Sequence, residues 1–144
     1  MSGNRHRARE FAVQGIYQWL LNHQSITQLA QQMREREEYA DLDEEWCLAL
    51  MQGVIGSVDE LDVRIAAFVD RPMQVLSPVE HAVLLLGAEE LLNHPEVPYR
   101  VVINEAVELT KTFGGVDGHK YVNGVMDKLA VAIRGEEVVP RKMR

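Results

Sequence analysis

Three arginines near the start of the chain could bind phosphate groups. Arg5, Arg7 and Arg9 alternate along the first helix-like segment, and Arg7 and Tyr17 recur on one flank of it at helical spacing. Cationic side chains beside an aromatic ring suit single-stranded nucleic acid, because the cations bind phosphates while the ring stacks on a base. The ordinary alternative is a solvated helix start with a frayed basic end, and this segment alone favours that alternative.

A second candidate surface follows near residue 120. Asp117, Tyr121, Gly124 and Lys128 fall on one stripe at helical spacing, and Lys120 flanks it. A tyrosine beside a glycine could stack on a ligand whose backbone passes close by. Alternatively, the glycine admits a neighbouring helix and the tyrosine packs at the rim. A glycine inside a helix costs roughly 1 kcal/mol relative to alanine, and either role offers compensation.

Residue types that often act in catalysis or metal binding are present, but they lack the sequence motifs of known catalytic and metal sites. The histidines are scattered, and none has the spacing of a two-histidine metal motif: His6, His23, His81, His94 and His119. The stretch "GGVDGHK" lacks the strand and the lysine position of a phosphate-binding loop. Cys47 has no nucleophile motif around it, so we interpret it as a small buried hydrophobe. Glu90 falls close to an apolar face, where a structural carboxylate paired with a neighbour is the more common case. We therefore expect no enzymatic activity, no metal site and no cofactor.

Length and composition predict one globular domain. The chain has 144 residues and a net charge of −7, but residues 35–62 hold ten acids and one base, so the rest of the chain is slightly basic. A polyanion could still bind the basic ends. The single cysteine and the absence of a secretory pattern favour the cytoplasm. No apolar run approaches the roughly 20 residues that cross a bilayer, so we expect no membrane association.

Apolar periodicity and capping residues predict a chain of helices. One helix spans about 5–21, a second begins at the Ser25 cap, and a long third runs from Asp41 or Asp43 to about Val69. A fourth begins at "SPVE" with Ser77 as its cap, and its residues 82–88 are apolar on every side, as expected of the central buried helix. A fifth runs from Pro98 to the glycines at 114–115, where a helix can end.

The sixth segment, "GHKYVNGVMDKLA", contains an Asn123-Gly124 pair that is typical of a hairpin turn. Its apolar residues nevertheless fall on one helical stripe and do not alternate between two faces of a strand. We therefore predict a helix here. The fold class predicted is all-α, with six to seven helices in two small helical bundles, about 5–70 and about 77–134, packed into a single domain 1–144. Residues 135–144 are expected to be disordered.

Three stretches carry a resemblance to a known family: "RHRAREFAVQGIYQW", "VPYRVVINEAVELTKTFGG" and "HKYVNGVMDKLA". Together they resemble the NusB transcription antitermination factors, over Arg5 to about Arg134. The resemblance implies two perpendicular helical bundles and no enzymatic activity. Members of that family pair with NusE, a small-subunit ribosomal protein, and the pair binds boxA RNA. This binding loads an antitermination complex on RNA polymerase, especially on ribosomal RNA operons.

The resemblance also implies roles for individual residues. Those expected to face RNA are Arg5, Arg7, Arg9, Asp117, Lys120 and Tyr121, and those expected to face NusE are Tyr17 and Glu80. The position of Glu80 is equally explained by capping of the helix that begins after Ser77. His6 stands where the family pattern has another arginine, and Tyr121 where phenylalanine is common. The first change weakens the cationic surface, while the second preserves stacking.

The alternative function is a helical protein-interaction module without significant RNA binding. If the three N-terminal arginines contact about three phosphates, the salt slope for single-stranded RNA is only about −2. We therefore expect modest RNA affinity for the chain alone and tighter binding with NusE. The sequence leaves the choice between monomer and homodimer open.

Overall fold

The computed structural model describes residues 4–36, 39 and 41–142, and within these ranges it contains eight α-helices and no β-strand. The all-α prediction is confirmed, with one helix more than expected. The elements in chain order are α1 (Arg5–Asn22), α2 (Ile26–Arg34), α3 (Glu44–Gly56), α4 (Val58–Ala66), the short 3-10 helix η2 (Met73–Val75), α5 (Pro78–Asn93), α6 (Tyr99–Phe113), α7 (Gly118–Ile133) and α8 (Gly135–Lys142).

Local capping explains where several helices begin. At α2, Ser25 and Gln28 form a reciprocal capping box, as the sequence predicts. At α5, the Ser77 hydroxyl accepts the backbone N–H of Glu80 at 3.1 Å, and Pro78 occupies the first turn. Asp43 caps α3 by accepting the backbone N–H of Trp46 at 3.2 Å, which decides between the two aspartates considered. These starts are encoded within four residues of sequence.

The long helix predicted from residue 41 or 43 to 69 is wrong, because the chain forms two helices there. Ser57 separates α3 from α4 with φ −131° and ψ 22°, outside the helical region. The break changes partners: α3 packs on α1 and α5, whereas α4 packs on α5 and α7. Only one residue leaves the helical conformation, so the apolar periodicity runs on almost unchanged and hides the break.

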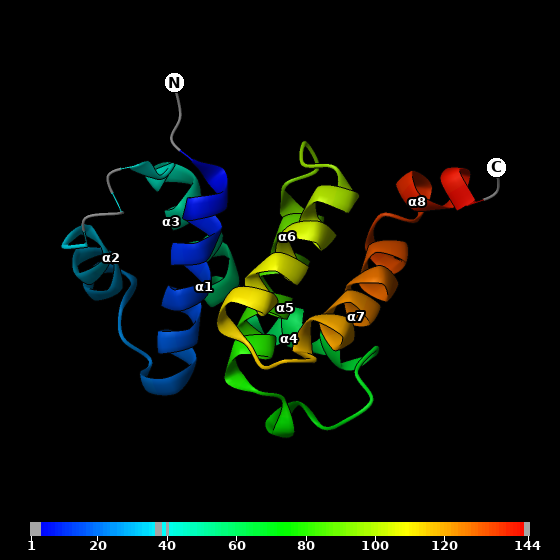
Figure 1. Cartoon of the computed structure of the whole chain (residues 1–144), viewed down its shortest axis with the longest axis horizontal. Helices are drawn as coiled ribbons and strands as arrows, with labels where there is room; N and C mark the ends of the chain where they lie inside the picture. Colours follow the sequence, from blue (N-terminus) through cyan, green and yellow to red (C-terminus); the bar gives the residue numbers. More distant parts are fainter. Residues whose placement is uncertain (1–3, 37–38, 40, 143–144) are drawn as a thin grey trace.

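Helix α5 forms the centre of the molecule. It contacts α1, α3, α4, α6 and α7, and every residue from Ala82 to Leu91 is buried. Figure 1 shows α1, α2 and α3 on one side of this central region and α7 and α8 on the other, with α6 overlapping α5 at the centre of the view. A helix packed on several sides has no polar face, which explains the apolar run at residues 82–88.

Helix α7 contains the Asn123-Gly124 pair in its interior, so the helix prediction is confirmed and the hairpin is excluded. Both residues are exposed, and a Cβ built on Gly124 would meet nothing within 4 Å. Gly124 is therefore not needed for the approach of another helix in this structure. Gly87 of α5 is the contrasting case, because a Cβ there would lie 2.5 Å from the Cε of Met126 in α7.

The prediction of a disordered tail is wrong for residues 135–142, which form α8. Arg134 anchors this helix by donating to the carbonyl oxygens of Leu91 at 2.9 Å and His94 at 2.9 Å. Glu137 accepts the backbone N–H of Tyr99 at 3.0 Å, and Val138 is only 1% exposed. These contacts join the tail to the start of α6 and the end of α5. Residues 143–144 lie outside the described ranges.

Candidate nucleic-acid interface

Arg5 and Arg7 lie on the first turn of α1, where Asn4 caps the helix by accepting the backbone N–H of Arg7 at 3.0 Å. The Arg5 guanidinium lies 3.7 Å from a carboxylate oxygen of Asp43 and 4.6 Å from the ring centre of Trp46. Arg7 pairs with Glu10 at 3.6 Å on its own helix. Both pairs are partly exposed to solvent and longer than a hydrogen bond, so they are weak and both guanidinium groups can exchange their partners for a phosphate.

Arg9 does not belong to this exposed group, and its predicted contact with RNA needs correction. Its side chain is 4% exposed and donates to both carboxylate oxygens of Glu90 at 2.9 Å. A third hydrogen bond of 3.1 Å reaches Glu105 of α6. The Arg9 guanidinium therefore joins α1 to α5 and α6 and is not available to a phosphate. The sequence contains a signal for this burial, because Ala12, Val13 and Ile16 follow Arg9 at the spacing of a buried helix face.

Glu90 is the structural carboxylate that the sequence predicts. Burial raises its pKa, while the hydrogen bonds and charge of Arg9 act in the opposite direction. His6 completes the cluster, with its Nδ1 2.7 Å from Glu105. The position where the family pattern has an arginine thus holds a side chain bound to the same carboxylate that Arg9 contacts. Four charged or titratable groups from three helices satisfy one another here.

The surface near residue 120 is present on the first turn of α7. Asp117 and Lys120 are both exposed, with their charged groups 3.7 Å apart. Tyr121 is half-buried and packs against the hydrophobic core, and its hydroxyl accepts the backbone N–H of Asp70 at 3.3 Å. The Arg71 guanidinium lies over the ring at 4.2 Å from its centre. The ring of Tyr121 is therefore covered by an arginine that the sequence did not single out.

Arg71 was missed because it lies in the connection between α4 and α5, far from Tyr121 along the chain. Its place in "DRPMQVLSP" follows no periodic pattern that could identify a partner. Figure 1 shows the start of α1 near the top of the view and the start of α7 near the bottom, so the two are separated across the molecule. The structure thus does not gather the predicted RNA residues into one compact site, and one RNA strand must run along the molecule to contact both groups.

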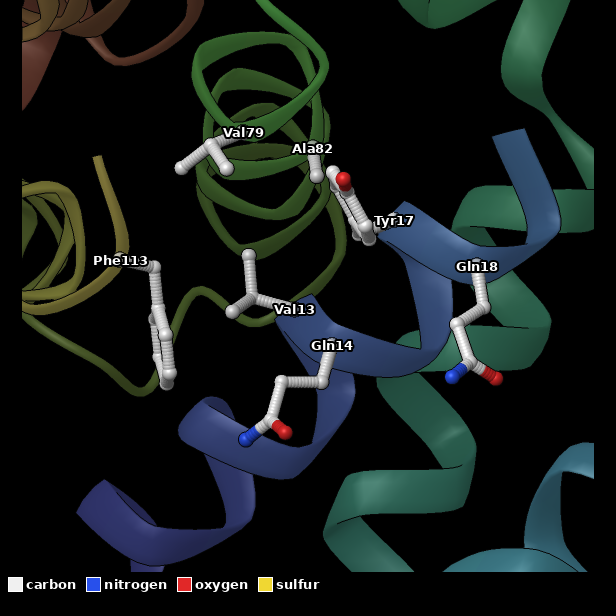
Figure 2. A pocket seen from close by; sticks show the side chains of 7 residues that line it. All are labelled: Val13, Gln14, Tyr17, Gln18, Val79, Ala82 and Phe113. Atoms are coloured by element: carbon white, nitrogen blue, oxygen red, sulfur yellow. The ribbon is translucent and has the colours of Figure 1, made fainter. Parts of the chain in front are cut away.

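Tyr17 lines a groove of about 320 Å³ between α1, α5 and α6. Figure 2 shows Tyr17 reaching toward Ala82 of α5, with Phe113 of α6 across the groove. The lining residues are Val13, Gln14, Tyr17, Gln18, Val79, Ala82 and Phe113. Apolar walls with amide groups at the rim resemble the composition of a protein-binding surface.

Glu80, the other residue predicted to face a partner, does not line this groove. Its carboxylate lies against the first residue of α7, where a Cβ on Gly118 would come within 3.0 Å of its Oε2. A carboxylate near a helix N-terminus is electrostatically favourable. Glu80 therefore faces the start of α7 as well as following the cap of α5.

The remaining residues that could act as a nucleophile or as metal ligands are either buried or far from one another. Cys47 is 0% exposed, and burial raises the pKa of its thiol to about 12, which confirms its interpretation as a buried hydrophobe. Across the described ranges, no three His, Cys, Asp or Glu side chains are grouped so that they could hold a metal ion. In the same ranges, no helix combines the length and apolar character needed to cross a membrane.

Comparison with known proteins agrees with this architecture. The family model described as "NusB family" matches residues 6–131. The chain is 50% identical to the transcription antitermination protein NusB of Chromobacterium violaceum, covering 100% of this chain and 97% of that relative. It is 49% identical to the protein of the same name from Thiobacillus denitrificans, covering 100% and 99%.

Solved structures show the same fold. A Thermotoga maritima NusB structure superimposes with a TM-score of 0.78 at 27% identity, covering 90% of this chain and 92% of that one. A chain from a crystal structure of the antitermination factors NusB and NusE in complex with dsRNA gives a TM-score of 0.76 at 24% identity, covering 88% and 96%. With the match over residues 6–131 and relatives about 50% identical along their length, this chain belongs to the NusB family.

Proposed function

We propose that this NusB-family chain acts in transcription antitermination by binding boxA-type RNA together with NusE, promoting antitermination on ribosomal RNA operons. The observation that carries the proposal is the full-length match to relatives named transcription antitermination proteins. The proposed activity is binding without catalysis, and it takes place in the cytoplasm, where nascent RNA emerges from RNA polymerase.

Two surfaces support RNA binding. Arg5 is exposed and Arg7 is half-buried on the first turn of α1, while Lys120 and Tyr121 lie on the first turn of α7 after its N-cap residue Asp117. Phosphate contacts at one surface and stacking at the other would hold an extended strand at two points. With Arg9 buried, two N-terminal arginines remain, and their electrostatic contribution to the salt slope is about −1.4.

The groove beside Tyr17 supports binding of NusE. Its walls come from α1, α5 and α6, which the core holds rigidly, so a partner can dock without reordering the chain. The small electrostatic contribution from two arginines explains why the partner is needed: a composite surface adds RNA contacts that the chain lacks by itself. We expect RNA affinity to increase in the presence of NusE, and by linkage NusE affinity to increase in the presence of RNA.

The test is a gel-shift titration of boxA RNA with the purified protein, with and without NusE, over a series of salt concentrations. The proposal expects weak binding by the protein alone and at least tenfold tighter binding with NusE, corresponding to about 1.4 kcal/mol of coupling. A scrambled RNA of equal length is the control. Equal affinity with and without NusE would contradict the proposal. If the protein binds NusE but the complex does not bind boxA RNA, the result would favour the alternative function, a protein-interaction module without RNA binding.

A further inference from the structure

We propose that Arg71, in the connection between α4 and η2, is an RNA-binding residue that presents a guanidinium plane stacked on Tyr121 to the bases of single-stranded RNA. This inference rests on the proposed function and assigns a further contact to the same surface. It also changes the role of Tyr121, whose ring becomes the support on which the arginine lies.

The geometry around Arg71 is fixed from two directions. Its guanidinium carbon lies 4.2 Å from the ring centre of Tyr121, and its Nε donates to a carboxylate oxygen of Asp70 at 2.9 Å. The backbone N–H of Asp70 in turn donates to the hydroxyl of Tyr121 at 3.3 Å. The connection after α4 is thereby joined to the first turn of α7.

The exposed parts of this cluster point to a ligand. The side chain of Arg71 is 42% exposed and that of Asp70 71% exposed, whereas Tyr121 packs against the hydrophobic core. A base approaching α7 from solvent therefore encounters the guanidinium together with the uncovered part of the ring. Guanidinium planes stack on bases much as aromatic rings do, and they also donate to phosphates.

The alternative explanation is that Arg71 only stabilises the fold. An exposed ion pair between neighbouring residues contributes little to stability, and a cation over a half-buried ring at the surface adds only a small amount. Lys120 lies one residue before Tyr121, so a second cation is available for the phosphates of the same strand. A cation fixed on an aromatic ring beside a second, exposed cation is the arrangement expected of a single-strand surface.

The charges facing Arg71 allow one substitution that should weaken RNA binding and another that should strengthen it. Asp70 hydrogen-bonds to it, and the negative charge of Glu80 also acts on it. The Arg71 guanidinium lowers the pKa of the Asp70 carboxyl, so Asp70 is charged at neutral pH and repels an approaching phosphate. Asp70→Asn removes that charge but keeps the backbone N–H that binds Tyr121 and a side-chain oxygen that can still accept from Nε of Arg71.

The experiment measures boxA affinity of the NusE complex by fluorescence anisotropy over a salt series. Arg71→Ala is expected to weaken binding about tenfold and to reduce the salt slope by about 0.7. Arg71→Lys should keep the slope and still bind several-fold more weakly, because lysine has no plane to stack. Asp70→Asn should bind roughly threefold more tightly, which damage to the fold cannot imitate.

Arg100→Ala is the matched control, because Arg100 also lies over a tyrosine, Tyr99, at 5.8 Å but at the far end of the α6–α7 pair. It should bind like the wild type. Wild-type affinity of Arg71→Ala, in a complex that binds boxA normally, would overturn the role of Arg71 and leave the proposed function intact. Failure of the wild-type complex to bind boxA would overturn the proposed function and this inference with it.

Discussion

Arg9 of α1 and Glu90 of α5 form two parallel hydrogen bonds of 2.9 Å in the interior of the protein. The pair joins helices that are 81 residues apart in sequence, and Glu105 of α6 binds the same guanidinium at 3.1 Å. An arginine within a basic N-terminal cluster thus holds three helices together. Its neighbours Arg5 and Arg7 remain on the surface.

Replacing Arg9 by alanine should lower the free energy of unfolding by about 3–5 kcal/mol, because it leaves a buried carboxylate without its partner. Urea denaturation followed by circular dichroism measures this loss. Arg7→Ala is the control and should change stability by less than about 1 kcal/mol, since its ion pair with Glu10 is partly exposed and screened by solvent. Equal losses for the two variants would contradict the distinction between a structural and a surface arginine.

The stability loss of Arg9→Ala should depend on pH. Burial raises the pKa of Glu90, and Arg9 is the main group that opposes this rise, with a smaller contribution from His94. Without Arg9, the folded protein binds a proton at Glu90 at a pH where the unfolded chain does not, so lowering the pH stabilises the folded state. The stability difference from wild type should therefore shrink between about pH 8 and about pH 5. A constant difference across this range would contradict the assignment of the loss to Glu90.

The two surface arginines of α1, Arg5 and Arg7, should account for part of the salt dependence of RNA binding. Replacing both Arg5 and Arg7 by alanine is expected to make the salt slope of boxA binding shallower by about 1.4 in the NusE complex. Replacing Lys111 and Arg100 of α6 makes the same change in net charge and serves as the control. An unchanged slope for the first variant would show that RNA does not contact the start of α1.

Tyr17 should contribute to NusE binding through the groove that it lines. Tyr17→Ala is expected to weaken NusE affinity at least tenfold in calorimetry, because a large aromatic side chain at the centre of an interface commonly contributes more than 1.4 kcal/mol. Binding of RNA to the protein alone should be unaffected. Gln18→Ala, at the rim of the same groove, is expected to change NusE affinity only slightly. Wild-type affinity for the Tyr17 variant would place NusE elsewhere.

Two helical glycines should respond oppositely to alanine. Gly124→Ala should stabilise the protein by about 1 kcal/mol, because the site is helical and its surroundings are open. Gly87→Ala should destabilise it by about 1–3 kcal/mol, because the new methyl group would displace Met126 from the contact between α5 and α7. Thermal unfolding measures both. Destabilisation by Gly124→Ala would indicate a contact that the structure does not contain.

Cys47 should react with thiol reagents only when the protein opens. Its thiol is buried within the core, and burial raises its pKa to about 12, so very little thiolate exists at pH 8 in the folded state. Labelling by a chromogenic disulfide should be slow in buffer and fast in urea. Because the chain has a single cysteine, all labelling reports on Cys47. Fast labelling of the folded protein would contradict the burial of α3 against the core.

Much of the fold was predictable because its determinants are local. Ser25 and Ser77 begin helices through hydrogen bonds to residues three positions later, and Gly114 follows the end of α6 where it was expected. The apolar stripe of α7 outweighed the hairpin tendency of Asn123-Gly124, because the periodicity extends over sixteen residues and the turn preference over two. These features need no knowledge of what each helix packs against.

The rest depended on which distant elements meet. The sequence by itself determined the all-helical architecture, most helix boundaries and the resemblance to the NusB family. The tertiary structure decided that Arg9 faces Glu90, that Ser57 interrupts a continuous apolar pattern, that residues 135–142 dock as α8 through Arg134, and that Arg71 covers Tyr121. The reason is physical: capping and periodicity act within a few residues, whereas pairing of buried charges and docking of short segments gain their free energy only from partners that the folded chain brings together.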